Sequence, residues 1–71
     1  MDFLERLKDE AKELAVKVNG LNTFMATEEF VALDRENKDL LYEQQRAMSV
    51  YLQILGKRLE ILGGEFEFKK D

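Results

Sequence analysis

The chain has 71 residues, of which 45% are hydrophobic and 37% charged, with no cysteine, no histidine and a formal net charge of −4. This composition is too apolar for a disordered tail, and it excludes disulfides, thiolate zinc sites and the commonest general base. The negative charge argues against general binding to nucleic-acid backbones. No apolar run approaches the roughly 18 residues of a membrane span, and the N-terminus is unlike a signal peptide. We therefore expect a soluble, cytoplasmic protein.

Residues 2 to about 25 are predicted to form a first helix. Asp2 can cap it, with Glu5 three residues later as in a capping box. Asn19-Gly20 taken locally indicates a helix stop, because glycine costs about 1 kcal/mol relative to alanine inside a helix. The apolar residues stay in phase beyond this point, so we expect the helix to run on, with or without a kink. They are Leu4, Leu7, Ala11, Leu14, Val18, Leu21 and Met25.

Thr27 starts a second, short helix predicted over residues 28–33. It is a favourable capping residue, and the acids Glu28 and Glu29 that follow suit the positive end of a helix. Phe30 and Leu33 are expected to close the end of a helical hairpin.

The long helix is predicted from Asp34, its cap, to Leu62, before the helix-ending Gly63-Gly64. Two apolar lines run along it at alternating spacings of four and three. The first, which we call the seam, contains Leu41, Gln45, Met48, Leu52, Leu55, Leu59 and Leu62. The other, which we call the second stripe, contains Leu40, Gln44, Ala47, Tyr51, Ile54, Arg58 and Ile61.

The two long helices are predicted to pair antiparallel, because their apolar lines agree in period and roughly in length. One first helix can cover the seam but not the second stripe as well, and an exposed apolar stripe marks an interface. The expected fold is therefore all-α, an antiparallel helical hairpin with a short connecting helix that assembles as a homo-oligomeric bundle. The predicted interface residues are Leu40, Ala47, Tyr51, Ile54 and Ile61.

Residues 1–64 are assigned to the helical hairpin domain and 65–71 to a C-terminal tail. In the tail, EFEFKKD alternates so that Phe66 and Phe68 share one side, which is a short strand pattern. Two interpretations stay open: a disordered end, or a strand or arm that packs on a neighbouring subunit.

The residues give little support to catalysis. Acid–base chemistry needs a titrating group in a water-excluded pocket, which a helical hairpin has little room to build. The acids Asp9, Glu10 and Glu13 fit a solvated face better than a site, and no glycine-rich phosphate loop or calcium-loop spacing is present. We expect a protein that is not an enzyme and has no cofactor and no metal site.

The stretch from Gln44 to Leu59 contains no acidic residue but has Arg46, Lys57 and Arg58. One flank of the long helix there carries Arg46 and Lys57, with Gly56 leaving a gap that a ligand could approach. The alternative is a solvated flank with a glycine tolerated for helix packing.

Arg58, Tyr51 and Gln44 lie in the second stripe itself. A buried charge needs a partner, so Arg58 requires a carboxylate, a carbonyl or a ligand anion, and Glu10 and Glu13 of the first helix are the candidate partners within the chain. Tyr51 combines an apolar ring with a polar tip, which suits an interface. The candidate ligand-binding residues are Gln44, Arg46, Tyr51, Lys57 and Arg58.

The chain up to Leu62 resembles small helical proteins encoded by bacteriophages and prophages. The similar pattern comprises FLERL, Leu14, Lys17, Leu21, Phe24, Phe30, Leu33, Leu40-Leu41, Gln44, Met48, Tyr51, Ile54-Leu55 and Arg58. By broader analogy in size and architecture, it is similar to the helical "sponge" proteins with which phages sequester cyclic nucleotide immune signals. That analogy implies an oligomer that binds nucleotides between subunits through basic and aromatic side chains.

Two functional hypotheses follow. The first is a non-catalytic oligomer, located in the host cytoplasm, that sequesters a cyclic nucleotide or another small anionic ligand. The alternative is a helical adaptor or inhibitor that binds a host protein.

Overall fold

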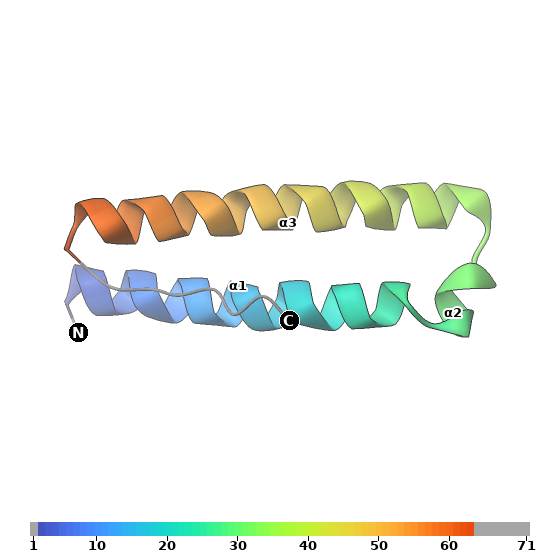
Figure 1. Ribbon diagram of the computed structural model, residues 1–71, viewed down its shortest axis with the longest axis horizontal. Coiled ribbons are helices and arrows are strands. Elements are labelled where there is room, and N and C mark those ends of the chain that lie inside the picture. The colour runs from blue at the N-terminus through green and yellow to red at the C-terminus, as the bar shows by residue number, and fades with distance from the viewer. Residues whose placement is uncertain (1, 64–71) are drawn as a thin grey trace.

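A computed structural model describes residues 2–63 as two long antiparallel helices joined by a short one (Figure 1). The elements are α1 (Phe3–Met25), α2 (Glu28–Val31) and α3 (Arg35–Ile61). The molecule measures 43 × 20 × 19 Å, as expected for helices of this length lying side by side. The predicted helical hairpin is therefore confirmed. The predicted tail from residue 65 onward lies outside the described residues.

Each helix begins at the capping residue that the sequence indicates. Asp2 accepts hydrogen bonds from the backbone N–H groups of Leu4 and Glu5. Thr27 Oγ1 accepts one from the Phe30 N–H at 3.3 Å, and Asp34 Oδ1 accepts one from the Asn37 N–H at 3.0 Å. These bonds satisfy donors that have no partner in the first turn of a helix.

The helix ends also follow the sequence. The first helix continues through Gly20 to Met25, as its apolar phase predicts. The short helix ends at Val31, two residues earlier than expected. The long helix ends at Ile61 and is followed by Gly63 with φ +81, a backbone conformation that glycine adopts without steric penalty.

The core is formed where the two apolar lines meet. Its buried residues are Leu7, Ala11, Leu14, Val18, Leu52, Leu55 and Leu59. Leu4, Ala15 and Met48 pack against this cluster. Gln45, the polar interruption of the seam, is half-buried and donates a hydrogen bond of 3.1 Å to Ser49. The end of the seam at Leu62 is exposed.

Phe30 closes the connector end of the hairpin, as predicted. Its buried ring meets Phe24 and Tyr42 edge to face, with centroid distances of 6.1 and 5.5 Å. Such aromatic contacts add to the area that the ring buries. Leu33 is half-buried beside this end.

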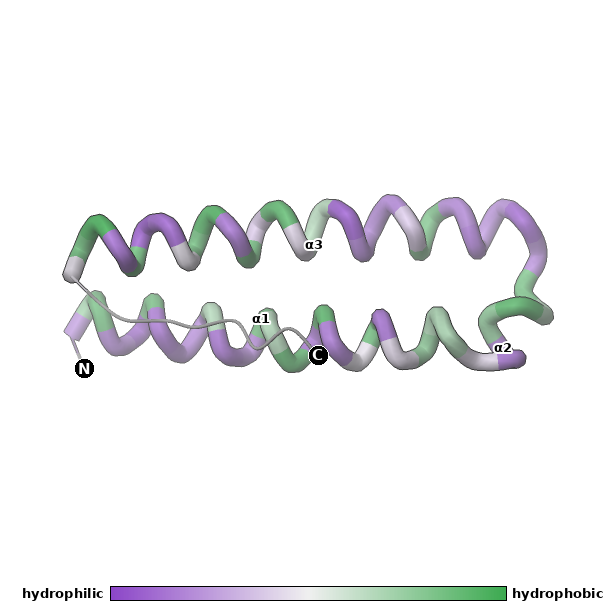
Figure 2. The backbone as a smooth tube through the Cα atoms, in the orientation of Figure 1, coloured by the Kyte–Doolittle hydropathy of each residue, from purple (hydrophilic) through white to green (hydrophobic). Residues whose placement is uncertain are grey.

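The second stripe is not covered by α1. Leu40, Ile54 and Ile61 are 56%, 49% and 84% exposed, and Figure 2 shows hydrophobic segments on the side of α3 turned away from α1. One first helix thus covers one apolar line of α3 and leaves the other open. Within residues 2–63, no helix combines the length and apolarity that crossing a membrane requires.

Candidate functional site

Two surface hollows contain the polar residues of interest, and they lie on different parts of the hairpin. One is an open hollow of about 350 Å³ between the start of α1 and the end of α3, which we call the open-end hollow. Its lining residues are Phe3, Arg6, Leu7, Glu10 and Arg58. The other is a shallow, largely apolar hollow of about 490 Å³ along α3. It is lined by Glu43, Arg46, Ala47, Val50, Tyr51 and Ile54.

The antiparallel pairing of the helices creates the open-end hollow. Phe3 is the first residue of α1 and Arg58 lies in the last turn of α3, so the hairpin brings together residues 55 positions apart in the sequence. The Arg58 guanidinium carbon lies 5.9 Å from the centre of the Phe3 ring, within the range of a cation–π contact. Both side chains are exposed, so the contact remains accessible from solvent.

Tyr51, in the second stripe, contacts the part of α1 that lines the open-end hollow. Its hydroxyl donates a hydrogen bond to the Glu10 carboxylate. Glu10 also lines the open-end hollow, so this bond fixes an acceptor at the border of the site. The hollow therefore contains two guanidinium groups, one carboxylate and one phenyl ring, with a second aromatic residue attached through Glu10.

The expected pairing of Arg58 with an acid of α1 is not seen. Arg58 is exposed, and within residues 2–63 no carboxylate forms an ion pair with it. Glu10 is hydrogen-bonded to Tyr51 instead, and Glu13 is exposed. The physical reason is that the second stripe faces solvent in the single chain, so the Arg58 charge stays hydrated and does not require a protein counter-ion.

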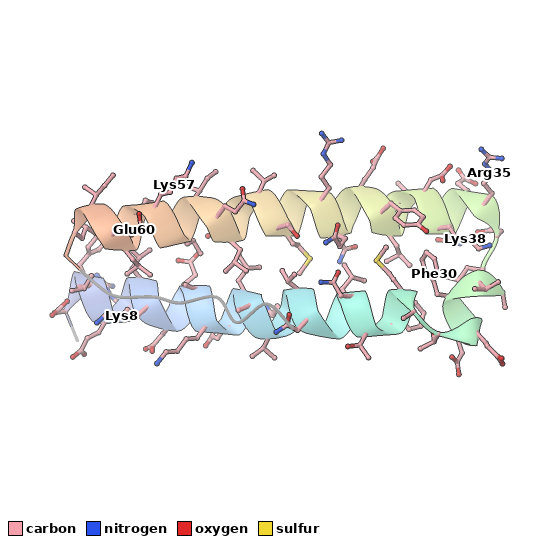
Figure 3. The ribbon with its side chains drawn as sticks, viewed as in Figure 1. Lys8, Phe30, Arg35, Lys38, Lys57 and Glu60 are labelled. Atoms are coloured by element: carbon pink, nitrogen blue, oxygen red, sulfur yellow. The ribbon has the colours of Figure 1, made fainter. Side chains whose placement is uncertain are left out.

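The predicted flank of Arg46 and Lys57 is less suited to a ligand. Gly56 is buried together with the core residues of α3, so no open gap lies at that position. This favours the alternative that the glycine serves packing. Lys57 points away from α1 in Figure 3, and Arg46 borders the shallow hollow. The structure therefore does not bring Arg46 and Lys57 to the hollow that Arg58 lines.

Gln44 is exposed on the second stripe, where its amide lies 3.8 Å from the Met48 sulfur. Of the five candidate ligand residues, then, only Arg58 lines the open-end hollow, and Tyr51 reaches its border.

Phe3 and Arg6 are site residues that sequence reasoning missed. The sequence suggested Glu10 and Glu13 of α1 as partners of Arg58, but not Phe3 or Arg6. The signal was present in the spacing: from the contact Phe3–Arg58 to the contact Glu10–Tyr51, the position moves seven residues forward on α1 and seven residues back on α3, as antiparallel heptads require. In the described part of the chain, no group of acidic side chains gathers closely enough to hold a metal ion.

Comparisons with known proteins give one family and one relative. The sequence model of the Sequestin family matches residues 1–61. An uncharacterised 7.5 kDa protein from the denB–rIIB intergenic region of Enterobacteria phage T4 is 32% identical over 57 residues. The alignment covers 80% of this chain and 89% of the T4 protein. No solved structure matches the chain.

Proposed function

The chain belongs to the Sequestin family, and from this premise we propose that it is a non-catalytic, oligomeric phage protein that sequesters a nucleotide immune signal of the host. The family name points to sequestration of a partner, and the T4 relative places a similar protein in a phage. A phage-encoded relative is consistent with action in the cytoplasm of an infected cell. The ligand class is the part of the proposal that rests on the site.

The open-end hollow carries this proposal. Arg6 and Arg58 provide guanidinium groups, which bind phosphate through charge-assisted and often bidentate hydrogen bonds. Phe3 provides an aromatic face beside them, on which a base can stack. The Glu10 carboxylate can accept a hydrogen bond from a base amino group or a ribose hydroxyl. Phosphate, base and sugar contacts are thus available within one hollow.

The composition of the chain and the openness of the hollow both favour binding without turnover. The chain has no histidine or cysteine to act as a base or nucleophile, and the hollow is open to water rather than enclosed. A protein of this kind would hold its ligand and release it unchanged. We therefore propose sequestration, with no reaction and no cofactor.

The test of this proposal is a thermal-shift screen of the full chain against cyclic di- and trinucleotides, followed by calorimetry. A ligand at 100 times its dissociation constant should stabilise the protein by about 2.7 kcal/mol. Chromatography of the nucleotide recovered after heat denaturation should return the compound unmodified. A converted product would contradict the non-catalytic reading.

Site variants localise the binding. Arg6→Ala and Arg58→Ala should each weaken affinity at least tenfold, because a hydrogen bond to a charged group contributes about 1.5–3 kcal/mol. Arg35→Ala is the matched control, since Arg35 is 94% exposed and lies at the connector end of the hairpin (Figure 3). If Arg35→Ala weakens binding as much as the other two, the effect is one of net charge and the open-end hollow is not the site.

A second candidate function is favoured by a different observation. The exposed apolar residues of the second stripe would suit a helical adaptor or inhibitor that presses α3 onto a host protein. If no nucleotide shifts the melting transition, the adaptor hypothesis replaces nucleotide sequestration.

A further inference from the structure

The open-end hollow contains opposite charges that do not pair. Arg6, Glu10 and Arg58 all line it. Arg6 and Glu10 are four residues apart on α1, the spacing at which opposite charges on a helix usually meet. Within residues 2–63, however, neither arginine forms an ion pair. The Glu10 carboxylate accepts its hydrogen bond from the Tyr51 hydroxyl of α3 instead.

The direction in which helical side chains lean shows what this bond prevents. Side chains on an α-helix lean toward its N-terminus, so a Glu10 side chain without a partner leans along α1 toward Arg6. Because α3 runs the opposite way, the Arg58 side chain leaves its helix in the direction of Tyr51, two turns or about 10 Å away along the axis. An unheld carboxylate at Glu10 would therefore meet both guanidinium groups.

We propose that Tyr51 is a positioning residue of the open-end hollow. Its hydroxyl holds the Glu10 carboxylate against α3 and so keeps it from neutralising Arg6 and Arg58. The two guanidinium groups then remain free for the phosphate of a bound ligand. This inference rests on the proposed function for the identity of the ligand, whereas the position of the carboxylate is a property of the ligand-free chain.

The chemistry of these groups shows why the constraint matters. A guanidinium group stays charged and offers five N–H donors, for which a carboxylate and a phosphate compete. The carboxylate belongs to the same chain and is always beside the arginines, whereas a ligand arrives from dilute solution. Without another partner for Glu10, each phosphate would first have to displace it, and affinity would fall. The neutral Tyr51 hydroxyl binds the carboxylate without adding a charge to the hollow.

The first test needs no ligand. Phenylglyoxal modifies free arginine side chains, and peptide mass spectrometry measures the rate at each position. In Tyr51→Phe, which keeps the ring and removes the hydroxyl, the summed modification of Arg6 and Arg58 should slow about two- to fivefold, as an exposed ion pair allows. Arg35, 94% exposed at the connector end (Figure 3), is the internal control and should react at the same rate in every variant.

A second substitution separates positioning from a merely structural bond. Glu10→Gln removes the charge, so the double variant Tyr51→Phe/Glu10→Gln should regain the natural rates at both arginines. Glu13→Gln is the matched control, because Glu13 is also exposed on α1 and its substitution changes the net charge equally. Combined with Tyr51→Phe, it should leave the rates slow. Unchanged rates in Tyr51→Phe, or equal rescue by Glu13→Gln, would overturn the inference.

Calorimetry with cyclic di-AMP relates the positioning to binding. Tyr51→Phe should weaken the affinity by a similar factor, about two- to fivefold, with unchanged helix content by far-UV circular dichroism. If the natural chain does not bind cyclic di-AMP, that result counts against the proposed function alone, since the arginine rates are measured without ligand. Full affinity in a Tyr51→Phe chain whose arginines react slowly would overturn the link between Glu10 and the ligand site.

Discussion

Replacing Arg58 with alanine gives the sharpest test of how the site is built. The guanidinium lies 5.9 Å from the centre of the Phe3 ring, and an exposed cation–π contact contributes about 0.5–1 kcal/mol. An ion pair between exposed side chains would likewise contribute at most about 1 kcal/mol. A buried ion pair within the hairpin would be different, because removing one partner costs about 3–5 kcal/mol. Since Arg58 is exposed, we expect the ligand-free Arg58→Ala variant to lose no more than about 2 kcal/mol.

The assay is thermal unfolding followed by far-UV circular dichroism at one fixed protein concentration. In a domain of this size, a change of 1 kcal/mol shifts the melting midpoint by about 4–8 °C. Arg58→Ala should therefore still unfold in a cooperative transition, with its midpoint lowered by less than about 16 °C. The control is Arg35→Ala, whose side chain is 94% exposed and which should change stability by no more than about 0.5 kcal/mol.

A loss of more than about 3 kcal/mol would refute this reasoning. It would mean that Arg58 is held by a buried counter-charge, and the ligand role of the open-end hollow would lose its central residue. A small loss of stability combined with lost nucleotide binding would instead indicate that Arg58 binds the ligand.

Three further predictions concern the hairpin itself. Leu55→Ala should lower the free energy of unfolding in urea by about 2–5 kcal/mol, because the side chain is fully buried; a loss below about 1 kcal/mol would place Leu55 outside the core. Asp34→Ala should cost about 1 kcal/mol in the same assay, through the lost 3.0 Å bond to the Asn37 N–H, and no change would argue against the cap. Gly20→Ala should raise stability by about 0.5–1 kcal/mol, since an added Cβ meets nothing within 4 Å inside a continuous helix. A destabilised Gly20→Ala protein would indicate a neighbour at that position, such as a second copy.

The predicted helices agree with the structure because their signals are local. The caps at Asp2, Thr27 and Asp34 act on N–H groups no more than three residues away, and the stop at Gly63 depends on one backbone angle. The continuation through Gly20 followed from the phase of Leu21 and Met25, which outweighed the local helix-breaking tendency of one glycine.

The composition of the core could also be predicted, because heptad spacing identifies the side of each helix that is apolar. The same spacing predicted that α3 has more apolar surface than one first helix can cover. The exposed Leu40, Ile54 and Ile61 agree with that expectation for the single chain.

The tertiary structure decided which side chains meet across the hairpin. It placed Glu10 against Tyr51 rather than Arg58, put Phe3 beside Arg58, and buried Gly56. Helical periodicity within one segment cannot determine these contacts, because they depend on how far two helices slide and rotate against each other. That register is set jointly by both core faces and by the length of the connector through α2. A pattern read along one helix therefore shows which residues are available, and the packing of both helices decides which of them form a site.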